Sequence, residues 1–287
     1  MKKKKIRRLL KIILIPILVV LCICLGYYLL QRYWAHRDGY FVPQYERVEL
    51  TEDSDYETIF FQTGLGQSAV DKLIKQKGFQ GVLDAQEAFF NPPEAKCREL
   101  IGWITREDLY TEAYSGGIKR QLVDIQPGDI LISLSTHTGG WRHGHAAIVL
   151  DQYTIIESAV LGADSQIVSV ADWVDYANYA VLRIKDVTPE QQQEVVDYCR
   201  EHLAGVPYSL LSGIFGDKAP DPDSEFFGLQ CSYLAWYAWY QFGYDLDSDG
   251  GRIVTPFDLL HSDQVDIVQI YGMDPYPFVE SGKTDGE

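Results

Sequence analysis

An uncharged apolar stretch near the N-terminus constrains this chain more than any other feature of its sequence. Residues 12–30 are 19 consecutive positions without a charged side chain, directly after a segment with seven Lys and Arg. As an α-helix this stretch would be roughly 28 Å long, close to the roughly 30 Å core of a bilayer. The sequence therefore predicts a transmembrane helix over residues 12–30.

The same region predicts an orientation. Basic flanks of a membrane helix stay in the cytoplasm, so residues 1–11 are predicted to be cytoplasmic and the chain after Leu30 to lie outside. A cleaved signal peptide is the alternative. The run ends in Tyr27-Tyr28-Leu29-Leu30, without the small residues of a cleavage site, which favours an uncleaved anchor. The expected location is the cell membrane, with a single pass and an extracytoplasmic body.

The rest of the chain is acidic. After residue 11 there are 18 Lys and Arg against all 41 Asp and Glu, a net charge of −23. Nucleic-acid binding needs a basic face, so no nucleic-acid partner is expected. A hydrophobic content of 46% indicates a folded protein.

Five cysteines are few for an exported protein. Cys22 and Cys24 fall in the apolar stretch, which leaves Cys97, Cys199 and Cys231. No pair has the C-x-x-C spacing of a metal site, so neither a metal site nor a cofactor is predicted. An odd number leaves at least one thiol free unless it pairs between chains.

Residues 31–120 are predicted to be a linker and an accessory helical region without visible chemistry. Residues 69–75 place Val70, Leu73 and Ile74 on one helical face. Two further helices are predicted at 82–90 and 95–104.

The pattern changes to strands near Pro127. Because these strands follow one another, with helices before and after, the predicted class is α+β, with a domain over residues 121–272. Residues 273–287 are predicted to be a C-terminal tail, disordered from 280. The predicted strands lie at 130–134, 145–150, 154–160, 179–184 and 265–271, and the helices at 188–203 and 231–242.

Cys231 stands at the start of the last predicted helix. A thiol attacks only as thiolate, and both a helix N-terminus and an adjacent His lower its pKa. Without a partner, a buried core cysteine would be the simpler interpretation. The Trp and Tyr residues that follow could stack on sugars, but their helical spacing favours core packing.

The candidate partner of Cys231 is His145, which Glu157 would orient. Both lie on predicted neighbouring strands, and a carboxylate in an apolar strand needs a polar partner. A turn centred on Asp151 would set the two opposite each other, whereas a two-residue turn would put them on different faces. The hypothesis of a His oriented by a carboxylate therefore requires a turn of odd length.

Six short pieces of this sequence occur in an informative order. They are Pro127-Gly128-Asp129-Ile130, Gly144-His145-Ala146-Ala147-Ile148-Val149, Glu157, Gly205-Val206-Pro207-Tyr208, Cys231-Ser232 and Thr255-Pro256-x-Asp258-Leu259. This order resembles the permuted NlpC-type papain-like cysteine amidases and peptidases of the YiiX/YaeF group, in which His and the acidic residue precede Cys. The resemblance covers roughly residues 121–272. It implies a circularly permuted papain-like domain whose antiparallel sheet packs on the cysteine helix.

The resemblance also implies roles for individual residues. Cys231 would be the nucleophile, His145 the general base and then acid, and Glu157 the residue that orients the imidazole. Tyr208 is predicted to line the pocket or to donate to the oxyanion, although an ordinary packed Tyr fits equally. Gln230, predicted to contact the substrate or oxyanion, stands where the group often has an aromatic residue.

Two further motifs leave alternatives open. His143 is a second possible base, although it has no paired acidic residue. Asp245, Asp247 and Asp249 match the start of a calcium loop, but Pro256 stands where the bidentate Glu belongs. An acidic turn is the simpler interpretation.

The predicted function is that of a membrane-anchored extracytoplasmic cysteine hydrolase. It would cleave an amide or ester bond in a cell-wall peptide or a lipid through an acyl-enzyme. The alternatives are a thiol acyltransferase of the same fold and a non-catalytic envelope-binding module.

Overall fold

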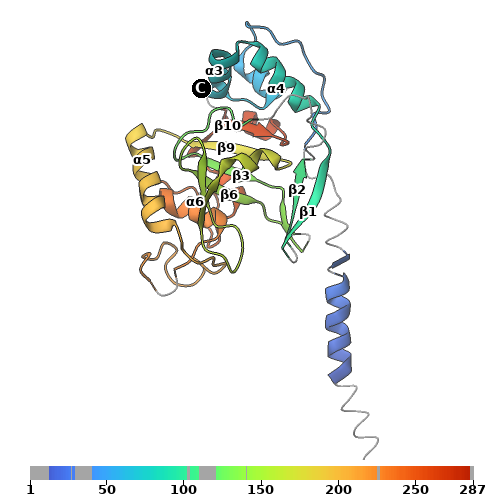
Figure 1. Cartoon of the computed structure of the whole chain (residues 1–287), viewed down its shortest axis with the longest axis vertical. Coiled ribbons are helices and arrows are strands. Elements are labelled where there is room, and N and C mark those ends of the chain that lie inside the picture. Colours follow the sequence, from blue (N-terminus) through green and yellow to red (C-terminus); the bar gives the residue numbers. More distant parts are fainter. Residues whose placement is uncertain are drawn as a thin grey trace, which may run out of the picture.

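An antiparallel sheet of six strands forms the centre of the molecule (Figure 1). Its strands are β3 (Ile130–Ser133), β6 (His145–Val149), β7 (Thr154–Glu157), β8 (Gln166–Ser169), β9 (Tyr179–Ile184) and β10 (Val265–Tyr271). They lie in the order β10-β9-β3-β6-β7-β8. The structure, a computed structural model, describes residues 13–26, 28–29, 41–101, 104–109, 121–139, 141–224 and 227–284. The prediction of an α+β chain with an antiparallel sheet is confirmed.

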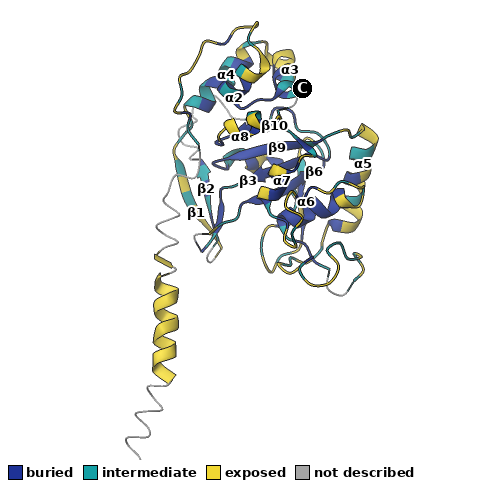
Figure 2. Ribbon diagram, turned by 180° about the vertical axis from the view of Figure 1, so that it is seen from behind, coloured by how far each residue is buried: buried dark blue, intermediate teal, exposed yellow. Residues whose placement is uncertain are grey.

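The sheet is buried on both faces at β3, β6, β9 and β10, which are mostly dark blue in Figure 2, whereas the edge strand β8 is largely exposed. Along β3, Ile130 and Ile132 point into one core and Leu131 into another, because successive side chains of a strand alternate. A strand covered on both faces is a continuous apolar run instead of an alternating one. This is why the sequence predicts these strands clearly.

The first core lies under helices from the C-terminal half. They are α5 (Pro189–Tyr198), continued by a π-helical turn (Cys199–Leu203), α6 (Cys231–Tyr240) and α7 (Pro256–His261). Helix α5 starts as predicted: Thr188 and Gln191 form a capping box, and Pro189 takes the first helical position. In α6 every residue from Cys231 to Trp239 is buried. The aromatic residues from Tyr233 to Trp239 are therefore core, as predicted, whereas Tyr240 is exposed.

The second core lies under α2 (Tyr56–Thr63), α3 (Gln67–Lys77) and α4 (Gln80–Phe90). These helices confirm the helical prediction for residues 56–90. On α3, Val70 and Leu73 are buried as predicted, whereas Ile74 is exposed.

The helix predicted at residues 95–104 is wrong. This segment forms strands β1 (Ala95–Ile101) and β2 (Ile104–Leu109), which pair as an antiparallel hairpin. They join β4 (Thr136–Thr138) and β5 (Trp141–Arg142) in a second sheet of order β1-β2-β4-β5. In β2 every second residue is buried: Thr105, Glu107 and Leu109. This period of two residues is that of a strand and not of a helix.

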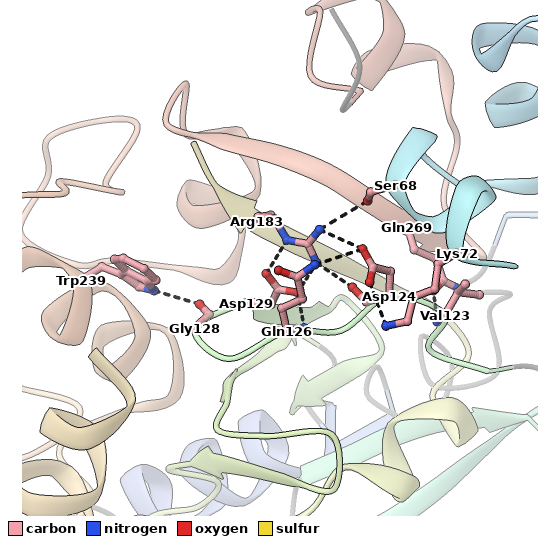
Figure 3. Close-up of polar contacts among 10 residues, drawn as sticks. All are labelled: Ser68, Lys72, Val123, Asp124, Gln126, Gly128, Asp129, Arg183, Trp239 and Gln269. Carbon is pink, nitrogen blue, oxygen red and sulfur yellow. Dashed lines mark hydrogen bonds and ion pairs between the residues drawn. The ribbon is translucent and has the colours of Figure 1, made fainter. Parts of the chain in front are cut away.

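A buried ion network joins α3 to the central sheet (Figure 3). The Arg183 guanidinium on β9 donates two hydrogen bonds to the Asp129 carboxylate, at 2.8 and 3.0 Å. It also donates to the Asp124 side chain at 2.9 Å. Lys72 of α3 binds the same Asp124 carboxylate at 2.9 Å. The accessory helices are thus attached to the residues that lead into β3.

The C-terminal segment packs against the rest of the molecule at residues 276–284. Helix α8 (Tyr276–Glu280) is followed by Lys283, whose carbonyl accepts a hydrogen bond from the Ile267 N–H of β10. The disorder predicted from residue 280 is therefore wrong for 280–284. Residues 285–287 lie outside the described part of the chain.

The N-terminal helix requires a correction to the predicted fold class. Within the described residues, no helix is both long and apolar enough to cross a membrane, so the predicted transmembrane helix is wrong. The described residues of this segment are helical at 13–26 and at 28–29. They are exposed along their length (Figure 2).

Candidate active site

Cys231 is the first residue of helix α6, as predicted. The Gln230 side chain caps this helix, since its oxygen accepts a hydrogen bond from the Ser232 backbone N–H at 3.3 Å. The Gln230 amide nitrogen in turn donates to the Val254 carbonyl at 2.7 Å, which fixes the cap. Because a helix N-terminus carries partial positive charge, this position stabilises a thiolate.

His145 opens strand β6 and Glu157 closes strand β7, so the register of this hairpin decides whether they meet. Ile148 lies opposite Ile156, which centres the hairpin on Gln152. The loop therefore has an odd number of residues and puts His145 and Glu157 on the same face, as the hypothesis requires. The centre lies one residue later than predicted, and the two residues are diagonal neighbours instead of direct opposites.

The Asp151 side chain explains this turn. Its Oδ1 accepts hydrogen bonds from the backbone N–H groups of Tyr153 and Thr154, both at 2.9 Å. The Leu150 N–H then donates to the Thr154 carbonyl at 2.9 Å and closes a three-residue loop. Asp favours such turns because its short side chain bonds the backbone two or three residues ahead.

The three predicted catalytic side chains come together. His145 Nε2 lies 2.8 Å from Glu157 Oε2. The same imidazole interacts with the Cys231 thiol and lowers the pKa of that thiol, while the thiol donates a hydrogen bond to Gln230 Oε1 at 3.5 Å. Since Nε2 is used by Glu157, Nδ1 is the nitrogen left for sulfur. The arrangement is a Cys-His-Glu chain in which a carboxylate fixes the imidazole and the imidazole faces the thiol.

The surroundings of Cys231 favour its thiolate. Burial raises the pKa of this thiol, but the hydrogen bond and the charge of His145 lower it more. The backbone N–H groups of Ala146 and Ser232 act in the same direction, and the net pKa lies below the ordinary value. Cys231 is therefore a nucleophile candidate on both geometry and charge.

The surroundings of the other two groups favour their charged forms as well. Burial opposes an imidazolium, but Tyr176, Glu157 and Cys231 together raise the pKa of His145 well above its ordinary value. Burial likewise opposes a carboxylate at Glu157, but His145 and then Arg106 hold its pKa below the ordinary value. A thiolate–imidazolium pair beside a carboxylate is the state that these shifts stabilise.

Tyr208 lies beside Cys231. It forms a parallel β-bridge with Leu229, two residues before the cysteine. Burial, and to a smaller extent Cys231, raise the pKa of its phenol. Its role at the pocket or oxyanion stays a prediction, as does a substrate contact by Gln230, whose side chain serves the helix cap.

His143, the alternative base, is held differently. Its Nε2 lies 2.8 Å from Thr138 Oγ1, and its Nδ1 lies 2.7 Å from the Gly144 carbonyl. Burial lowers the pKa of His143, so this imidazole stays neutral where His145 is charged. The geometry favours His145 as the base.

Two aromatic residues of the site are absent from the sequence-based prediction. Trp173, in a 3-10 helix (Val170–Asp175), stacks on the His145 imidazole with centroids 5.6 Å apart. Tyr176 lies nearly parallel to the same ring, at 6.4 Å and 8°. No motif links this segment to His145, and only the folded chain brings them together.

The acidic turn of Asp245, Asp247 and Asp249 is stabilised by side chains of other segments. Lys218 forms an ion pair with Asp247, and Asp245 accepts a hydrogen bond from the Trp236 indole at 2.7 Å. Carboxylate oxygens of Asp247, Asp249 and Asp258 lie within 4.8 Å of one another. Calcium binding here stays untested.

Among known structures, a distant neighbour of this chain is metalloprotein yiiX from Escherichia coli O157:H7. The TM-score is 0.39 at 16% sequence identity, and the match covers 50% of this chain and 96% of yiiX. No family model and no curated protein matches the chain. The neighbour carries the name of the group that the sequence resembles. At this distance it supports neither a site nor a metal for this chain.

The site predicts selective alkylation of Cys231. Burial raises the pKa of both Cys97 and Cys199, whereas that of Cys231 is lowered. With limiting iodoacetamide at pH 7, peptide mass spectrometry of the full chain should find Cys231 labelled before the other two. Cys97 is the more accessible thiol, so exposure alone would reverse this order. As the pH rises and Cys97 ionises, the preference should shrink; equal labelling at pH 7 would contradict an activated thiolate.

Proposed function

We propose that this chain is a cysteine hydrolase that cleaves an amide or ester bond through an acyl-enzyme on Cys231. The observation that carries the proposal is the position of His145, which is bonded to Glu157 through Nε2 and interacts with the Cys231 thiol. The order His, Glu, Cys along the chain fits a permuted papain-like domain. The preference for a thiolate–imidazolium pair supports carbonyl chemistry over a purely structural cysteine.

The first half-reaction follows from the geometry. The Cys231 thiolate attacks the substrate carbonyl carbon, forming a C–S bond and an oxyanion. The backbone N–H of Cys231 is one of the helix-terminal N–H groups without a helical acceptor, so it can donate to that oxyanion. The His145 imidazolium then gives its proton to the leaving amine or alcohol, and the C–N or C–O bond breaks.

The second half-reaction restores the enzyme. Neutral His145 accepts a proton from water, whose oxygen attacks the acyl-enzyme carbonyl. The C–S bond breaks, a carboxylic acid leaves, and the thiolate–imidazolium pair forms again. Glu157 holds the imidazole throughout and stabilises its charge.

The substrate class and location belong to the proposal. A cell-wall peptide or a lipid amide or ester supplies the carbonyl that Cys231 needs. An extracytoplasmic site of action is part of the proposal, as the location of a cell-wall peptide.

Trapping of the acyl-enzyme tests the proposal. The full chain is mixed with a cell-envelope extract and quenched with acid, and the mass of the Cys231 peptide is measured. We expect an adduct on Cys231 in the wild type and none in Cys231→Ala, and its mass separates peptide from lipid acyl groups. Turnover of the same extract components by Cys231→Ala would overturn the proposal.

A further inference from the structure

Arg106 reaches the candidate active site from a segment that the sequence places outside the catalytic domain. It lies on β2, and its guanidinium carbon stands 4.0 Å from the centre of the Tyr176 ring. The Asp108 carboxylate accepts hydrogen bonds from the same guanidinium. Only 11% of the Arg106 side chain is exposed, so its position is fixed.

Tyr176 connects this cation to the catalytic imidazole. Its ring stacks on Trp173 with centroids 4.7 Å apart. Both rings also stack on His145, at 5.6 Å for Trp173 and 6.4 Å for Tyr176. A guanidinium over an aromatic face is attracted by the ring's negative quadrupole, more strongly where water is excluded. Arg106 therefore braces the ring that bounds one side of His145.

We propose that Arg106 is a positioning residue for the His145–Glu157 pair, so that the β1–β2 hairpin is part of the active site. The inference rests on the proposed function. Arg106 acts through Tyr176, which limits the tilt of the imidazole, and as a fixed cation near Glu157.

The electrostatic effect has a clear sign. Next to His145 itself, Arg106 is the cation that helps to hold the pKa of Glu157 below its ordinary value. Loss of Arg106 should raise that pKa, so that Glu157 is protonated at a higher pH and stops stabilising the imidazolium. Other titratable groups around this pair are His143, Tyr176 and Cys231.

Arg98 offers a matched control on the same hairpin. It lies opposite Arg106 in the β1–β2 register and also pairs with Asp108, at 2.7 Å. Both arginines line the same hollow of about 340 Å³ between the hairpin and the 3-10 helix. The Arg98 side chain is 58% exposed. A substitution at Arg98 therefore removes a positive charge from the hairpin, as Arg106→Gln does, but leaves the cation over the Tyr176 ring in place.

The test is the pH profile of Cys231 alkylation, which needs no substrate. The full-length wild type, Arg106→Gln, Arg106→Lys and Arg98→Gln are treated with iodoacetamide from pH 4 to 9, and their unfolding midpoints are measured. The acid limb of the profile is the range in which the alkylation rate rises with pH. In Arg106→Gln we expect this limb to lie at a pH higher by about half a unit or more. On that limb the rate at a fixed pH should then fall roughly threefold to tenfold. Arg106→Lys should lie between, because it keeps the charge without the planar stack, and Arg98→Gln should follow the wild type.

The outcomes separate this inference from the proposed function. An Arg106→Gln profile that superimposes on the wild type overturns the positioning role alone. So does an equal shift in Arg98→Gln, which would indicate a general effect of the hairpin. If Arg106→Gln does not fold, Arg106→Met takes its place as the variant without the charge; a wild-type profile in Arg106→Lys overturns the stacking role alone, because lysine keeps the charge. A wild type whose Cys231 reacts no faster than Cys97 overturns the proposed function and this inference with it.

Discussion

Replacement of His145 by Gln is expected to lower the rate of acyl-enzyme formation by about a hundredfold to ten-thousandfold. The amide can still bond Glu157, so the fold should keep its stability, but it can neither hold nor transfer a proton. Burial then dominates at Cys231 and raises the pKa of its thiol, as it does at Cys199. Iodoacetamide labelling of Cys231 at pH 7 should fall by about tenfold or more.

His143→Gln is the matched control for this prediction. His143 lies two residues away, is partly buried, and is bonded by Thr138 and the Gly144 carbonyl, with no acidic partner among the described residues. We expect its acylation rate to stay within about threefold of the wild type, since no proton transfer passes through it. Equal losses in the two variants, at equal stability, would remove the reason to name His145 as the base.

The sequence predicts the His–Glu hairpin because the pairing of two consecutive strands depends only on nearby residues. A two-residue period fixes which side chains share a face, so an odd loop was enough to bring His145 and Glu157 together. The position of the loop depends on which backbone groups Asp151 bonds, and both Tyr153 and Thr154 contribute. That choice is set by fine turn geometry, and the predicted centre was wrong by one residue.

The hairpin at residues 95–109 shows where local patterns fail. Its polar sequence has no single apolar face, because β2 buries the polar side chains of Thr105 and Glu107, the latter bonded by Arg142. Its pairing partner β4 lies some 30 residues further along the chain. Arg106 becomes part of the site only through that pairing and through Tyr176 on another segment. Neither relation has a periodicity that the sequence could reveal.

The Pro127-Gly128-Asp129 turn acquires a structural meaning beyond its value as a motif. Gly128 has a φ of +86°, which favours glycine, and its carbonyl accepts a hydrogen bond from the Trp239 indole at 3.1 Å (Figure 3). Trp239 belongs to the same helix as Cys231. The next residue, Asp129, accepts two hydrogen bonds from the Arg183 guanidinium of the central sheet. The turn thus links the nucleophile helix, the central sheet and the accessory helices.

Replacement of Arg183 by Met is expected to lower the free energy of unfolding by about 3–5 kcal/mol, the largest stability effect predicted for this chain. It removes both hydrogen bonds to Asp129, whose side chain is only 1% exposed, and leaves a buried carboxylate without its cation. Urea unfolding followed by tryptophan fluorescence measures the loss. Burial already raises the pKa of Asp129 to about 6, and without Arg183 the pKa rises further. The loss should therefore be largest above pH 6 and shrink below it, where the carboxyl is neutral in both proteins.

Lys72→Met is the matched control in the same network. Lys72 also binds a carboxylate, that of Asp124, but its side chain is 38% exposed, so the expected cost is about 1 kcal/mol or less. The double variant Arg183→Met with Asp129→Asn should recover part of the loss, because it removes the buried charge together with its partner. If Arg183→Met cost no more than Lys72→Met at pH 8, or if the double variant were as unstable as the sum of its parts, the buried Arg183–Asp129 pair would not stabilise the fold by charge.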